Sequence, residues 1–114
     1  MAMIKLEAVI LPSKLDIVKT SLIELGLGGM TVYEVHGHGR QDGRTHSYRG
    51  STYTIVLLPA IKIELVVHED QVETVIDVIV RTAATGKDGD GKIFLTRIDD
   101  LIRIRNQQRG VAAL

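Results

Sequence analysis

The sequence predicts one α+β domain in which two strand-helix-strand units form a four-stranded sheet with both helices on one face. The chain has 114 residues, 45% of them hydrophobic, which suits one compact domain with its own core. Four short segments have the alternating or β-branched pattern of strands, and two others repeat apolar residues at helical spacing. We therefore expect residues 1–114 to form a single domain.

The first unit consists of a strand, a helix and a second strand. Apolar and polar residues alternate over residues 4–10, and Pro12 ends this strand. Ser13 and Asp16 resemble a capping pair at the start of a helix. The second strand, rich in Val, Thr and Tyr, runs from about Met30 to His36. The apolar positions of the helix are Leu15, Val18, Leu22 and Leu25.

A long loop separates the two units. Residues 37–54 follow no periodic pattern, and a loop of this length in a small domain is usually functional or partly disordered. After Pro59 the chain alternates again as a third strand, up to Val67.

The second unit continues with a helix and a fourth strand. Asp70 and Glu73 form a second capping pair, and a glycine-rich turn over residues 85–91 follows the helix. The fourth strand covers residues 93–96, and the charged tail over residues 99–114 is expected to be irregular. The apolar positions of this helix are Val72, Val75, Ile76 and Ile79.

This order of elements, β-α-β-loop-β-α-β, is that of the ferredoxin-like arrangement. Both crossover helices then lie on one face and leave the other face bare. Apolar strand residues such as Val9, Val66 and Val67 fall on both sides of the sheet, so we expect association through the bare face. A monomer with an ordinary amphipathic sheet is the alternative.

The composition argues against several classes of protein. Fourteen basic residues balance fourteen acidic ones, and aromatic residues make up 4%, so neither a nucleic-acid surface nor a lipid-binding surface is expected. The chain has no cysteine, which excludes disulfides and thiol catalysis. Its apolar runs are too short for membrane insertion, and no segment resembles a signal peptide, so we expect a cytoplasmic protein.

The glycine-rich turn is the strongest candidate for an anion site. Residues 86–93 nearly spell a P-loop, but Ile93 follows Lys92 where a hydroxyl is needed, and the turn joins a helix to a strand. Its glycines still allow backbone N–H groups to converge on a phosphate, with Lys92 adding charge. A plain helix cap followed by a turn is the alternative.

Three weaker signals lie elsewhere. Arg103 and Arg105 would point the same way in an extended chain and could meet one polyphosphate, although a solvated tail is the simpler interpretation. The segment from Gly37 to Gln41 offers backbone donors. His36 and His38 could hold a metal, but two surface histidines are the better interpretation. We find no residue pattern that indicates catalysis.

At two places the sequence resembles the signatures of the PII nitrogen-regulatory signal proteins. Residues 85–95 fit the C-terminal signature of that family without a mismatch, and residues 48–53 fit its loop signature with one departure, Thr52, where the family has Glu or Ala. Residues 29–32, 37–41 and 102–105 also match family blocks.

This resemblance implies a compact homotrimer with three ATP/ADP sites in the clefts between subunits. The long loop, about residues 38–55, would be the T-loop, which docks on a target enzyme, a regulator or a membrane transporter. Gln41 matches the side chain that helps hold Mg²⁺, bound with ATP, beside 2-oxoglutarate. Tyr53 and Ser51 match modification sites of some members. The implied nucleotide contacts are Thr31, Gly37, His38, Gly39, Arg40, Gln41, Val66, Gly89, Asp90, Gly91, Lys92, Arg103 and Arg105.

The chain departs from the family pattern near the second ligand. Ala60 follows Pro59 where the family has a lysine, Leu11 stands where a basic residue is usual, and His38 replaces a usual phenylalanine. A dicarboxylate would meet two fewer positive charges, so we expect little or no binding of 2-oxoglutarate.

The expected function is a non-catalytic regulator of nitrogen or carbon metabolism. Two alternatives remain: a small nucleotide-hydrolysing enzyme on the same fold, and a PII-like sensor of another small anion such as bicarbonate.

Overall fold

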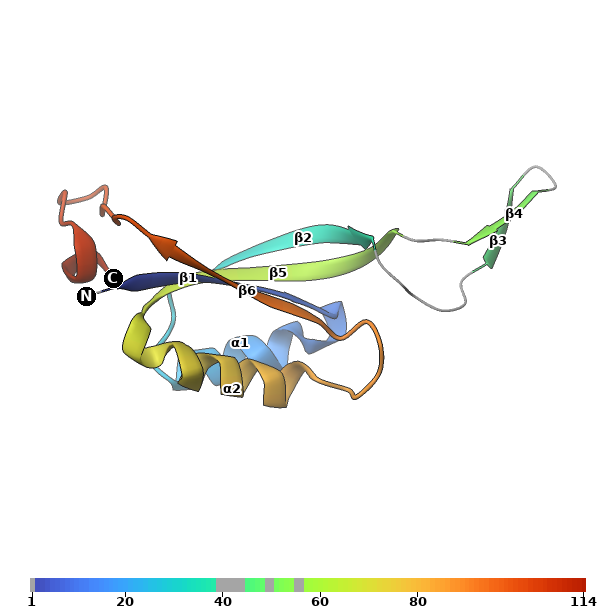
Figure 1. The fold of residues 1–114 in the computed structure, drawn as a ribbon, viewed down its shortest axis with the longest axis horizontal. Helices are drawn as coiled ribbons and strands as arrows, with labels where there is room; N and C mark the ends of the chain where they lie inside the picture. Colours follow the sequence, from blue (N-terminus) through green and yellow to red (C-terminus); the bar gives the residue numbers. More distant parts are fainter. Residues whose placement is uncertain (1, 39–44, 49–50, 55–56) are drawn as a thin grey trace.

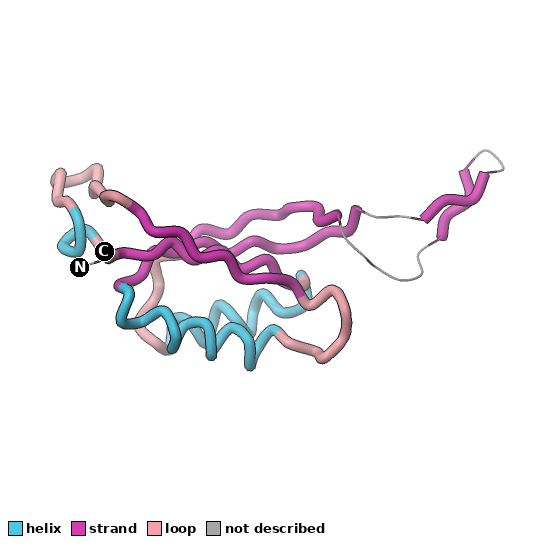
Figure 2. Tube along the Cα trace, viewed as in Figure 1, coloured by secondary structure: helices cyan, strands magenta, loops and turns pink. Residues whose placement is uncertain are grey.

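A computed structural model of the chain describes residues 2–38, 45–48, 51–54 and 57–114. It has two layers, a sheet and a pair of helices that pack side by side below it (Figures 1 and 2). In the described residues no helix is both long and apolar enough to cross a bilayer. The strands are β1 (Met3–Ile10), β2 (Thr31–His38), β3 (Thr45–Tyr48), β4 (Ser51–Thr54), β5 (Leu57–His68) and β6 (Gly91–Ile98). The helices are α1 (Leu15–Glu24) and α2 (Val72–Ala83), with the short 3-10 turns η1 (Pro12–Lys14), η2 (Glu69–Gln71) and η3 (Gly110–Ala113).

The main sheet has four antiparallel strands in the order β2-β5-β1-β6. Alternate residues of β1 and β5 are buried against α1 and α2, as the period of two requires. Leu6 and Ile63 from the sheet meet Leu22, Val75 and Ile79 from the helices, all at most 2% exposed. The predicted ferredoxin-like α+β fold is confirmed.

The helix starts differ from the prediction. Neither Ser13 nor Asp70 caps its helix through its side chain, because each α-helix is preceded by a 3-10 turn that already has helical backbone. Pro12 occupies the first position of η1, where its missing N–H costs nothing. At η2 the cap is His68, whose Nδ1 accepts a hydrogen bond of 3.2 Å from the backbone N–H of Asp70.

The strands that flank the long loop extend beyond the predicted limits. β2 continues to His38, and β5 begins at Leu57, before Pro59 rather than after it. Pro59 of β5 pairs with His36 of β2. On its other side β5 has no partner at this point among the described residues, because β1 ends at Ile10, opposite Ile61. The missing N–H of proline therefore costs no hydrogen bond to β1. The prediction also missed the hairpin of β3 and β4 inside the loop.

The face of the sheet opposite the helices is less apolar than expected. Val67 lies on the covered side and is buried. On the bare side Glu7 bridges Lys5 at 3.3 Å and Lys62 at 3.1 Å, and Lys62 lies 5.4 Å from the centre of the Tyr33 ring. The hydrogen bond from Lys62, followed by that from Lys5, holds the pKa of Glu7 below its usual range. The expectation of an apolar face is therefore wrong: charges alternate with residues such as Val9 and Phe94.

Candidate functional site

The glycine-rich turn between α2 and β6 has a backbone that needs its glycines. Gly86, Gly89 and Gly91 have φ values of 84°, 92° and 112°, which side-chain-bearing residues rarely adopt. At Gly91 the strand is also pressed against β1, where an added Cβ would lie 1.7 Å from the carbonyl oxygen of Val9. The turn therefore has a specific shape, and is more than a simple helix cap.

The carboxylate of Asp90 holds this turn together. One oxygen accepts hydrogen bonds from the backbone N–H groups of Thr85 at 2.7 Å and Gly86 at 3.0 Å, and the other accepts the Thr85 hydroxyl at 2.5 Å. These contacts hold the pKa of Asp90 below its usual range, and the hydrogen bond from the Thr85 hydroxyl has the largest effect. Thr85 was absent from the predicted set, because sequence spacing alone does not show which side chain closes a turn.

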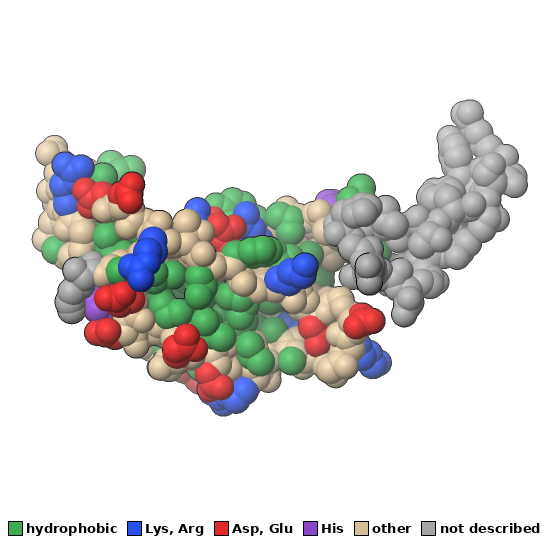
Figure 3. Space-filling model, viewed as in Figure 1, with side chains coloured by type: hydrophobic (Ala, Val, Ile, Leu, Met, Phe, Trp, Pro, Cys, Tyr) green, Lys and Arg blue, Asp and Glu red, His purple; other side chains and the backbone are tan. Residues whose placement is uncertain are grey.

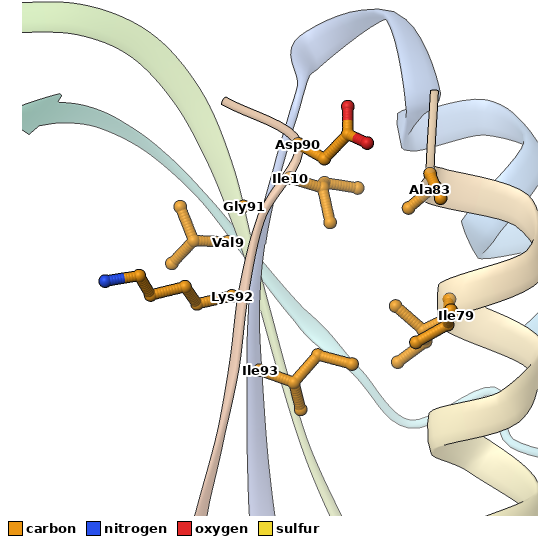
Figure 4. Close-up of a pocket in the computed structure, with 10 residues that line it drawn as sticks. Val9, Ile10, Ile79, Ala83, Asp90, Gly91, Lys92 and Ile93 are labelled. Atoms are coloured by element: carbon orange, nitrogen blue, oxygen red, sulfur yellow. The ribbon is translucent and has the colours of Figure 1, made fainter. Parts of the chain in front are cut away.

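Lys92 faces the opposite way from Asp90. It pairs with Val9 on β1, and its exposed side chain points away from α2, on the bare side of the sheet (Figure 4). On the α2 side the same stretch of β6 borders an apolar cavity of about 360 Å³ lined by Ile79, Ala83 and Ile93. Val80 also lines this cavity and is half exposed, and Figure 3 shows apolar surface where α2 lies next to β6. The ammonium group of Lys92 is therefore available to an anion outside this cavity.

A second group of predicted residues lies further along the sheet. Thr31 and Val66 line a hollow of about 260 Å³ together with Glu64, which pairs with Thr31, and with Leu101 and Leu114 of the tail. This hollow has apolar walls and polar groups at its edge, a combination suited to a flat organic ring.

Arg103 forms hydrogen bonds within the tail, residues 99–114, beside this hollow. Its guanidinium donates to the backbone carbonyls of Ala113 at 3.2 Å and Leu114 at 3.0 Å, and to the side chain of Gln108 at 3.1 Å. The prediction that Arg103 and Arg105 point the same way assumed an extended chain. The chain forms a turn here instead, because Gln107 donates its backbone N–H to the carbonyl of Arg103. Arg105 lies in that turn with its side chain exposed.

The predicted nucleotide contacts thus form two separate groups within one chain. Gly37, Gly89, Gly91 and Lys92 lie toward the end of the sheet where the long loop leaves it, whereas the tail with Arg103 lies at the other end (Figure 1). The six residue steps from Lys92 to the end of β6 at Ile98 span about 20 Å at the usual rise of a strand, and the tail begins beyond them.

Part of the predicted set lies outside the described residues. Gly39, Arg40 and Gln41 belong to this part, and for His38, Ser51, Thr52 and Tyr53 the structure describes the backbone but not the side chains. In the described ranges no group of three or more His, Asp or Glu side chains is arranged to hold a metal ion.

The two positions that lack a basic residue are neighbours in the fold. Ala60 directly precedes Ile61, Leu11 directly follows Ile10, and Ile10 pairs with Ile61 across β1 and β5. Both positions are partly exposed at the end of the sheet next to the long loop. Neither can contribute a positive charge there.

Comparison with known proteins agrees with this architecture. The sequence model of the family described as "Nitrogen regulatory protein P-II" matches residues 3–108. The chain belongs to the PII family. PII proteins of the cyanobacterium Synechocystis and of Escherichia coli K12, named "Nitrogen regulatory protein P-II" and "Nitrogen regulatory protein P-II 1", are 51% and 52% identical to it. Each alignment covers 96% of this chain and 98% of the relative.

A solved PII structure has the same fold. The crystal structure of Arabidopsis thaliana PII bound to citrate matches with a TM-score of 0.81 and 35% identity, over 99% of this chain and 92% of that one. This PII chain is therefore a nitrogen-regulatory signal protein by family.

Proposed function

We propose that this chain acts as a homotrimeric, non-catalytic regulator that binds ATP or ADP between subunits and signals through its long loop. The separation of the two residue groups carries this proposal. Lys92 and the glycine turn would hold the phosphates, whereas the hollow beside Thr31 and Val66 suits the adenine ring. A nucleotide could meet both groups only if they came from neighbouring copies.

A trimer supplies such a cleft three times. In a cyclic assembly each copy presents one face to one neighbour and a different face to the other, so three identical clefts form. The bare side of the sheet would lie inside this assembly. Its ion pairs around Glu7 would then be shielded from water, so the association would depend on paired charges as well as on apolar contact.

A binding role fits the turn better than hydrolysis does. Hydrolysis needs a base or nucleophile next to the phosphates. The carboxylate of Asp90 is directed instead into the turn, toward Thr85 and Gly86, and away from Lys92. Asp90 is therefore a poor candidate for activating water.

The segment from about residue 38 to 55 is the proposed contact for a target protein. Its described part carries the hairpin of β3 and β4, which stands apart from the main sheet and presents strand edges (Figure 1). Deletion of residues 47–52 should abolish capture of a target and leave nucleotide binding intact. A deletion variant that still captures the same target would place the contact elsewhere. The names of the relatives favour a target in nitrogen metabolism.

Calorimetry and light scattering together test the proposal. The purified protein should behave as a trimer and bind ADP and ATP, the latter with Mg²⁺, with one site per chain. A monomer, or a trimer that binds neither nucleotide, would contradict the proposed function.

A further inference from the structure

The side chain of Asp90 is the best-connected group in the glycine turn, although it points away from Lys92. It accepts three hydrogen bonds from two residues, Thr85 and Gly86, which lie five and four positions earlier in the chain. The Thr85 hydroxyl in turn accepts the backbone N–H of Lys87 at 3.3 Å. A short network of hydrogen bonds therefore links the first half of the turn to the residue just before β6.

The next residue of the chain is under the tightest constraint. Gly91 begins β6 with a φ of 112° and its Cα against the carbonyl of Val9, so the direction in which the turn enters the strand is narrowly defined. The hydrogen bonds of Asp90 hold the backbone just before Gly91, and the close contact with β1 holds Gly91 itself. Gly89 and Lys92, the proposed phosphate contacts, lie directly on either side of these two residues.

We propose that Asp90 is a positioning residue for phosphate binding: its carboxylate, held by Thr85, fixes the turn in the shape from which the backbone of Gly89 and Gly91 and the ammonium of Lys92 meet the anion. This inference rests on the proposed nucleotide site. It assigns the carboxylate a role without contact to the nucleotide, since a negative side chain next to a phosphate would repel it. A rigid turn also binds with a smaller loss of conformational freedom than a mobile one.

The chemistry of the network explains why a carboxylate stands here. Both oxygens of Asp90 act as acceptors, which is what two N–H groups and one hydroxyl require. An asparagine could still accept both N–H groups through one oxygen, but its amino group would face the hydroxyl of Thr85 and reverse that contact. Alanine would remove all three contacts. The network therefore predicts a graded series, with Asp90→Asn between the unmodified protein and Asp90→Ala.

The test compares binding of ADP and of adenosine, which lacks phosphate, by calorimetry. Asp90→Ala and Thr85→Val should each weaken ADP binding about tenfold or more, as expected for losing a hydrogen bond to a charged group. Adenosine binding should change less than about twofold, because the adenine hollow involves other residues. Thr85→Ser keeps the hydroxyl and should bind ADP like the unmodified protein. Asp88→Ala removes a neighbouring exposed carboxylate of the same turn and serves as the matched control.

Each other outcome has a clear meaning. Unchanged ADP affinity in folded Asp90→Ala and Thr85→Val would overturn the positioning role and leave the proposed function intact. Equal losses for ADP and adenosine would also overturn it, since the defect would then not concern the phosphates. If the unmodified protein bound no ADP, the proposed function would fail, and the role of Asp90 with it.

Discussion

Lys92 and Arg103 lie toward opposite ends of one sheet. Lys92 is the second residue of β6 and pairs with Val9, whereas Arg103 follows the other end of that strand and donates to the carbonyls of Ala113 and Leu114. Two cations so far apart in one chain cannot hold the same phosphate chain. If both bind ATP, they belong to different copies.

Removing either cation should weaken ATP binding. We expect Lys92→Ala or Arg103→Ala to cost about 1.5–3 kcal/mol, the usual value of a charge-assisted hydrogen bond. ATP should lose more affinity than AMP, which calorimetry with both nucleotides will show. The matched controls are Lys87→Ala in the same turn and Arg97→Ala on β6, both exposed and outside the predicted set. Equal losses for ATP and AMP would mean that these cations do not face the outer phosphates.

The positions of Ala60 and Leu11 concern the second ligand. They lie next to Ile10 and Ile61, the last paired residues of β1 and β5, so the two positions that lack a basic side chain are close together. Each missing contact should cost about 1.5–3 kcal/mol, so we expect 2-oxoglutarate to bind weakly or not at all, even with saturating MgATP. Ala60→Lys should restore part of the affinity, and Ala60→Gln, similar in reach but neutral, should not. Micromolar binding by the unmodified protein would show that these charges are not required.

Gly91 should not tolerate even a methyl group. Gly91→Ala places a Cβ against the carbonyl of Val9 and forces a left-handed backbone on alanine, so we expect a loss of about 2 kcal/mol or more in the free energy of unfolding. Urea unfolding followed by circular dichroism measures this. Gly28→Ala is the control, because a Cβ at Gly28 meets no atom within 4 Å. A Gly91→Ala variant as stable as this control would contradict the close contact between β1 and β6.

The tail should loosen in acid. Asp100 accepts hydrogen bonds from the N–H of Leu101 at 2.8 Å, from Arg109 at 2.9 Å and from the N–H of Gly110 at 3.1 Å. These contacts hold the pKa of Asp100 below its usual range, and the hydrogen bond from the N–H of Leu101 has the largest effect. A lowered folded-state pKa stabilises the protein above the unfolded-state pKa, near 3.9, and this stabilisation is lost as the pH falls further through the folded-state pKa.

Asp100→Asn tests this dependence. The variant should be less stable than the unmodified protein at pH 7, and the difference should shrink as the pH falls below about 4, because the native carboxyl then becomes protonated. Urea unfolding at a series of pH values gives both curves. A difference that stays constant down to pH 3 would show that the charge of Asp100 does not hold the tail.

The sequence predicted the parts of this fold that repeat with a regular period. The alternation over residues 4–10 and 61–67, and the apolar spacing of Val72, Val75 and Ile79, reflect burial on one face, so strands, helices and topology followed from them. The capping residues did not follow, because a 3-10 turn that begins at Pro12 moves the start of α1. Such turns depend on local geometry that has no period.

The candidate site was only partly predictable for a related reason. Residue types in the glycine turn indicated an anion site, but not that Asp90 turns inward to Thr85 while Lys92 turns outward. The tail was expected to be irregular, although Arg103 bonds to a carbonyl eleven residues later, at Leu114. Contacts of this kind join single residues and leave no repeated pattern to detect.

A mixing experiment tests the shared cleft most directly. Lys92→Ala and Arg103→Ala proteins, each impaired in ATP binding, are unfolded together in equal amounts, refolded and compared with each variant refolded alone. If each cleft takes Lys92 from one copy and Arg103 from the next, random assembly gives about a quarter of the clefts both cations, so strong ATP binding returns at that fraction of sites. ATP binding in the mixture that is no better than the average of the two variants would contradict a site shared between copies.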